Sequence, residues 1–75
     1  MSQDSKKAEP VLNVEFDREQ DGRWIAEIPE LPGVLAYGRT KEEALIKVQA
    51  LAYRVIADRI EEEGVTRDSV RFAFA

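Results

Sequence analysis

The segment from Lys41 to about Glu62 constrains the fold most, because it predicts one long amphipathic helix. Its apolar residues return at the helical period and form a broad stripe that needs a surface to pack against. The stripe consists of Ala44, Leu45, Val48, Leu51, Ala52, Val55 and Ile56. Thr40 with Glu43 three residues later has the pattern of a capping box, and Gly64 stands where a left-handed C-terminal cap is expected. The helix therefore has a defined start and end.

Around this helix the apolar residues alternate with period two, which indicates half-buried strands. We expect strands over residues 11–17, 23–28, 34–38 and 70–74. Asp21-Gly22 supplies a turn after the first strand, and the proline- and glycine-rich run 29–33 ends the second. The sequence predicts an α+β fold of order β-β-β-α-β. Its parts are a three-stranded antiparallel meander, a C-terminal fourth strand and the helix packed on one face.

Length and composition limit how such a fold is stabilised. The chain has 75 residues with no cysteine and no histidine, which excludes disulfides and zinc held by nitrogen or sulfur ligands. We expect residues 1–10 to form a disordered tail and residues 11–75 a single domain. A domain of this size buries a limited share of its surface, so a second subunit or a partner is the expected source of extra stability.

Charge and hydropathy restrict location and partners. No segment is long and apolar enough to span a bilayer, and residues 1–9 lack the apolar core of a secretory signal, so we expect a cytoplasmic protein without membrane contact. The net charge of −4 argues against direct nucleic acid binding, which depends on phosphate neutralisation. An acidic domain is better suited to a basic protein partner.

A second apolar flank runs along the predicted helix beside the sheet-facing stripe. It is formed by Ile46, Tyr53, Ala57 and Ile60. A single helix on a single sheet needs only one buried stripe, so we expect this flank to contact another subunit in a homo-oligomer, a dimer or a tetramer. The alternative is that the flank lies along the edge of the sheet.

The chain offers few residues for catalysis, and we expect neither an enzyme nor a bound cofactor or metal. Histidine and cysteine, the commonest bases and nucleophiles, are absent, and the four glycines are scattered turn residues rather than a phosphate loop. Glu15 and Asp17 fall on the polar side of a strand, where solvated acids are ordinary. Trp24 is interpreted as a packing residue, with a partner contact as the alternative.

Two consecutive stretches, 22–33 and 37–44, resemble the HicB antitoxin family. The family pattern is a strand with Trp and Ala, then Pro-x-Leu-Pro-Gly, then Gly-x-Thr-x-Glu-Glu-Ala opening a helix. The matching positions are Trp24, Ala26, Pro29, Leu31, Pro32, Gly33, Gly38, Thr40, Glu42, Glu43 and Ala44. The resemblance extends over about residues 11–62.

The resemblance implies a partial RNase H-like fold without nuclease activity. Its expected partner is a small basic HicA-type toxin, an mRNA-cleaving protein whose active site the antitoxin masks. Many HicB antitoxins also carry a C-terminal DNA-binding domain. Because this chain ends at Ala75, directly after the fourth predicted strand, we do not carry over autorepression.

Charge complementarity suggests which residues would meet a basic toxin. We expect contacts from Glu15, Asp17, Glu27 and Glu30 together with Leu31. Two other functions stay open. One is a solitary structural or regulatory homo-oligomer with no toxin, and the other is a vestigial nuclease that depends on divalent ions.

Overall fold

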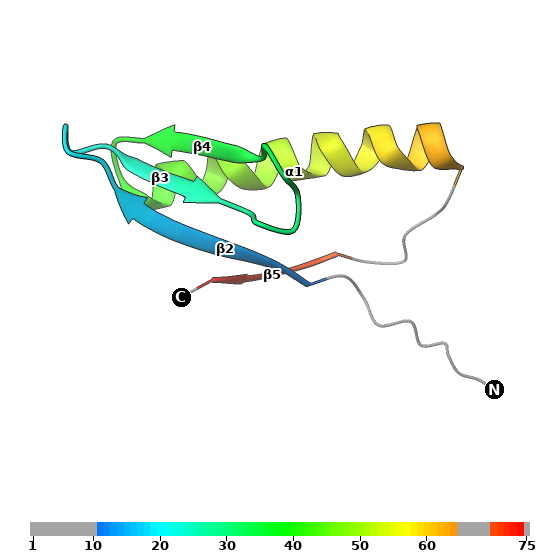
Figure 1. Ribbon diagram of the computed structural model, residues 1–75, viewed down its shortest axis with the longest axis horizontal. Helices are drawn as coiled ribbons and strands as arrows, with labels where there is room; N and C mark the ends of the chain where they lie inside the picture. The colour runs from blue at the N-terminus through cyan, green and yellow to red at the C-terminus, as the bar shows by residue number, and fades with distance from the viewer. Residues whose placement is uncertain (1–10, 65–69, 75) are drawn as a thin grey trace.

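Strand β2 (Val11–Arg18) organises the sheet, because it pairs along both of its edges. The computed structural model describes residues 11–64 and 70–74, and the expected tail over residues 1–10 lies outside them. One half of β2, Glu15–Arg18, pairs antiparallel with β3 (Trp24–Glu27). In turn β3 pairs antiparallel with β4 (Leu35–Gly38), which completes the predicted meander (Figure 1).

The fourth strand, β5 (Arg71–Phe74), joins the sheet on the other side of β2. It runs parallel to β2 and pairs with the first half of that strand, Val11–Val14. The strand order is therefore β4-β3-β2-β5, with the helix as the crossover between β4 and β5 (Figure 1). A parallel neighbour requires such a long connection, since a tight turn can join only antiparallel strands.

Helix α1 (Lys41–Glu63) begins and ends close to where the capping pattern predicts. The Thr40 hydroxyl accepts a hydrogen bond from the Glu43 backbone N–H at 3.0 Å. Gly64 adopts the left-handed conformation with φ of 69°, and its N–H donates to the Ile60 carbonyl at 2.8 Å. These contacts satisfy backbone groups that a helix end leaves unpaired.

The core lies between α1 and the sheet, and the predicted stripe of the helix faces it. Ala44, Val48 and Ala52 are fully buried, while Leu45, Leu51, Val55 and Ile56 pack against the core from its margins. The sheet and the connection between β3 and β4 contribute Leu12, Val14, Ala26, Ile28, Leu31 and Val34. The structure thus confirms the α+β fold with one helix on one face.

Trp24 belongs to this helix-facing side of the sheet. It is half-buried against the core, and two cations lie over its ring: the Arg18 guanidinium at 5.1 Å and the Lys41 ammonium at 5.8 Å from the ring centroid. Aromatic rings attract cations at this range. The arrangement agrees with the packing interpretation of Trp24.

Candidate partner-binding face

The sheet has one face covered by α1 and one face that the helix leaves uncovered. We call the second surface the open face. Side chains alternate between the two faces along each strand, so the residues between the buried ones point away from the helix. Across β2, β3 and β4 the open face carries Glu15, Asp17, Ile25, Glu27, Leu35 and Tyr37.

Strand register arranges these six residues in two rows. In one row Glu15 lies opposite Glu27, which lies opposite Leu35. In the other row Asp17 lies opposite Ile25, which lies opposite Tyr37. Both rows run from an acidic residue on β2 to an apolar or aromatic residue on β4. The face is therefore acidic at one side and apolar at the other.

The pairing of Glu15 with Glu27 works against the stability of the sheet. Residues directly opposite in an antiparallel pair have Cβ atoms about 4.5–5.5 Å apart, and like charges at that separation are destabilising. Both side chains are exposed, and the ion pairs of Arg23 with Asp21 and of Lys47 with Glu43 involve neither of them. A cationic group from another molecule would relieve this repulsion.

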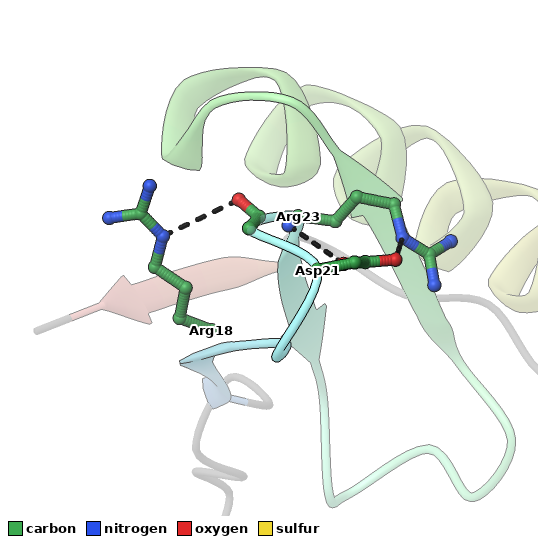
Figure 2. A network of polar contacts seen from close by, with 4 residues as sticks. Arg18, Asp21 and Arg23 are labelled. Atoms are coloured by element: carbon green, nitrogen blue, oxygen red, sulfur yellow. Dashed lines mark hydrogen bonds and ion pairs between the residues drawn. The ribbon is translucent and has the colours of Figure 1, made fainter.

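The apolar side of the open face is supported by the turn between β2 and β3. The Arg23 guanidinium lies over the Tyr37 ring, 4.4 Å from its centroid. The Asp21 carboxylate accepts hydrogen bonds from the Arg23 backbone N–H at 3.0 Å and from Arg23 Nε at 2.8 Å (Figure 2). In the same turn, Arg18 Nε donates a hydrogen bond to the Gly22 carbonyl at 3.4 Å. Tyr37 and Leu35 nevertheless remain 39% and 37% exposed, so the patch is accessible to a partner.

Glu30, the fourth predicted acidic contact, has a different role. Its carboxylate accepts hydrogen bonds from the Asn13 backbone N–H at 3.0 Å and from the Asn13 amide Nδ2 at 2.6 Å. These bonds, with the side-chain bond as the larger cause, hold the pKa of Glu30 below its ordinary value. Glu30 therefore caps the part of β2 that extends past β3, and its charge is already engaged within the chain.

Leu31 does not lie on the surface as the contact prediction requires. It is only 5% exposed and packs in the core with Ile28 and Val34. The Leu31 N–H donates to the Ile28 carbonyl at 2.9 Å, which turns the chain and directs the side chain inward. The turn was predicted from its prolines and glycine, but the burial of its leucine depends on the helix packed above it. We therefore leave Leu31 out of the contact surface.

The predicted oligomer residues lie along α1. Ile46 and Tyr53 are 60% and 54% exposed, Ala57 is exposed and Ile60 is half-buried. The Tyr53 ring meets the Phe72 ring of β5 edge-on, with centroids 5.5 Å apart. This contact agrees with the alternative interpretation, in which the flank lies along the edge of the sheet, at Tyr53.

Comparison with known proteins finds a relative in the archaeon Thermoplasma acidophilum. This chain is 32% identical to the UPF0150 protein Ta0767 over 53 residues, which cover 69% of the chain and 77% of the relative. The chain belongs to the UPF0150 family. No family model and no solved structure matches it. The name of the relative states no activity and no partner.

The described part of this UPF0150 protein offers neither a cluster of metal ligands nor a membrane-spanning helix. Within residues 11–64 and 70–74, no three acidic side chains come together in a group that could hold a metal ion. In the same residues, no helix combines the length and the apolar character needed to cross a membrane.

Sequence reasoning missed the apolar half of the open face in this UPF0150 protein. Ile25, Leu35 and Tyr37 alternate with core residues along their strands, so the period of two in the sequence already predicts that they point away from the core. The sequence does not predict that they form one patch, because this depends on the antiparallel register of β3 with β4.

Proposed function

We propose that this protein is a non-catalytic binding module that masks a small basic protein of the HicA toxin type through its open face. HicB-like families often carry the UPF0150 label, which agrees with the motif resemblance in residues 22–33 and 37–44. The observation that carries the proposal is the Glu15–Glu27 pair, which forms no ion pair with a cation of residues 11–64, beside an exposed Leu35–Tyr37 patch. An acidic side next to an apolar and aromatic side complements a partner surface that carries both basic and apolar residues.

The proposed masking role rests on charge complementarity. A toxin that cleaves mRNA needs a basic surface for phosphates, and an acidic face that occupies this surface excludes RNA. The chain has no histidine or cysteine to support catalysis of its own. We place the complex in the cytoplasm, where such a toxin meets mRNA.

The test compares binding and stability in the variant Glu27→Gln. Removing one of two like charges should raise the free energy of unfolding of the isolated protein by roughly 0.2–1 kcal/mol. The same change should slow association with any small basic protein encoded by a neighbouring gene and flatten the salt dependence of binding. The measurements are chemical denaturation, and association kinetics at several salt concentrations alongside an RNA-cleavage assay of the partner.

The matched control is Glu62→Gln, which removes an exposed acid from the end of α1, away from the open face. It should leave association unchanged. If Glu27→Gln and the control bind alike, the open face is not the contact surface. If no neighbouring basic protein binds or loses its RNase activity, the antitoxin role is wrong.

A second candidate function, a solitary homo-oligomer of this fold, is favoured by a different observation. Ile46 and Tyr53 of α1 are 60% and 54% exposed, and α1 covers the face of the sheet opposite the open face. Self-association without any basic partner would support this candidate. A vestigial nuclease would instead require RNA cleavage that depends on divalent ions.

A further inference from the structure

Tyr37 lies on the open face, where α1 does not cover it. Its side chain and that of Leu35, two residues earlier on β4, are both exposed. The core lies on the other face of the sheet, so core packing does not hold the Tyr37 ring in place. Its position depends on neighbours on the open face itself.

The neighbour that holds the ring is Arg23, which directly precedes β3. It stands two residues before Ile25, and Ile25 lies opposite Tyr37, so Arg23 and Tyr37 are diagonal neighbours. A long side chain reaches that far across an antiparallel pair. The Arg23 guanidinium lies 4.4 Å from the centroid of the Tyr37 ring, within the range of a cation–π attraction. Arginine is itself flexible, however, and can fix the ring only if it is fixed as well.

Asp21 fixes Arg23 at two points. One carboxylate oxygen accepts from the Arg23 backbone N–H at 3.0 Å, and the other accepts from Nε at 2.8 Å (Figure 2). Such charge-assisted bonds are shorter and stronger than those between neutral groups. The ion pair also offsets the charge of Arg23, which would otherwise repel a basic partner. Asp21, Arg23 and Tyr37 thus form a chain of contacts from the turn to the open face.

A tyrosine held in this way is suited to binding. Tyrosine and arginine are among the residues in which binding energy concentrates at protein interfaces. A side chain that is already ordered also loses less conformational freedom when a partner arrives. We propose that Tyr37 is the contact for an apolar side chain of the basic partner, and that Asp21 is a positioning residue that acts on Tyr37 through Arg23. The inference rests on the proposed function and assigns a separate role to the apolar side of the open face.

The two sides of the face should differ in kinetics. Exposed acids such as Glu27 act mainly on the association rate and on its salt dependence. A packed aromatic contact acts mainly on the dissociation rate. The probe is the small basic protein encoded by a neighbouring gene, and the measurement is association and dissociation kinetics at several salt concentrations.

Asp21→Asn tests the positioning role. Asparagine keeps an oxygen for the Arg23 backbone N–H but places an amide nitrogen where Nε needs an acceptor. Dissociation of the complex should become about two- to tenfold faster, because the ring must then be ordered on binding. The matched control Glu19→Gln removes the same charge from the same connection between β2 and β3. It should change association as much as Asp21→Asn does and leave dissociation unchanged.

Variants of Tyr37 test whether Asp21 acts through the ring. Tyr37→Leu should speed dissociation about tenfold or more. Adding Asp21→Asn to Tyr37→Leu should have no further effect, because the ring to be positioned is gone. Tyr37→Phe keeps the ring and should dissociate like the unmodified protein.

Nuclear magnetic resonance of the full chain tests the contact without a partner. Side-chain protons of Arg23 that lie over an aromatic ring are shifted upfield by its ring current. This shift should be lost in Tyr37→Leu and reduced in Asp21→Asn, and it should be retained in Glu19→Gln. Circular dichroism confirms that each variant folds.

The outcomes separate the inference from the proposed function. Arg23 signals that do not change in Tyr37→Leu would overturn the contact itself. A reduced shift in Asp21→Asn without faster dissociation would overturn the positioning role, while the masking function would stand. If no neighbouring basic protein binds, the proposed function fails and this inference fails with it, whatever the Arg23 signals show.

Discussion

At the scale of single residues, Gly38 shows why a position in the motif admits only the smallest side chain. It is buried at the end of β4, where the start of α1 crosses the strand. A Cβ atom added there would collide with the Ala44 backbone nitrogen and lie 2.9 Å from the Glu43 carbonyl carbon. These atoms belong to the helix backbone, so they have no rotamer through which to move away.

Gly38→Ala should therefore destabilise the fold by about 1–3 kcal/mol, the typical cost of overpacking a core. Urea denaturation monitored by Trp24 fluorescence measures the change. The exposed control Gln20→Ala should stay within about 0.5 kcal/mol of the unmodified protein. A Gly38→Ala variant as stable as the control would mean that the helix start does not pack this closely on β4.

At the scale of elements, the start of α1 is built from reciprocal hydrogen bonds. Thr40 accepts from the Glu43 N–H, and the Glu43 carboxylate accepts from the Arg39 N–H at 2.6 Å. In the usual capping box the glutamate returns to the cap residue itself. Here it reaches one residue further back, and so ties the end of β4 to the helix. Lys47 extends the arrangement through an ion pair with Glu43 at 3.5 Å.

Thr40→Ala removes the hydroxyl acceptor and leaves the Glu43 N–H without it, which should cost about 1 kcal/mol. Thr40→Ser keeps the hydroxyl and should retain most of the stability. Equilibrium denaturation followed by helical circular dichroism compares the two variants. Equal losses in both would assign the effect to the threonine methyl group rather than to the cap.

At the scale of the whole molecule, three carboxyl groups give stability the same dependence on pH. The pKa of Asp21 is lowered chiefly by the Arg23 backbone N–H, that of Glu30 by the Asn13 side chain, and that of Glu43 by the Arg39 backbone N–H. Each group therefore binds its proton less readily in the folded chain than in the unfolded chain. Their contribution is complete above the ordinary values, 3.8 for Asp and 4.5 for Glu, and is lost as the pH falls through the folded values.

The free energy of unfolding should change little between about pH 6 and pH 8, because the chain has no histidine to titrate in that range. It should fall on acidification below about pH 4.5, as these carboxylates become protonated. Glu30→Gln removes one of the three groups and should lose less stability over the acidic range. Denaturation curves at a series of pH values measure both slopes. Parallel curves for the two proteins would show that the Asn13–Glu30 contact does not contribute to the pH dependence.

The sequence by itself determined the elements of this protein, because each depends on neighbours a few residues away. Period two marked the strands, and the capping pattern and Gly64 marked the ends of α1 to within a residue or two. The apolar stripe identified the side of the helix that packs on the sheet. These signals come from local backbone geometry, which a short stretch of sequence contains in full.

Only the tertiary structure decided which distant residues meet. It put β5 parallel to β2, set Glu15 against Glu27, joined Glu30 to Asn13 and buried Leu31. Each of these depends on strand register or on packing between elements, where a shift of one residue would move a side chain to the other face of the sheet. The composition of the open face therefore followed from the assembly of the whole core, and local pattern alone could not supply it.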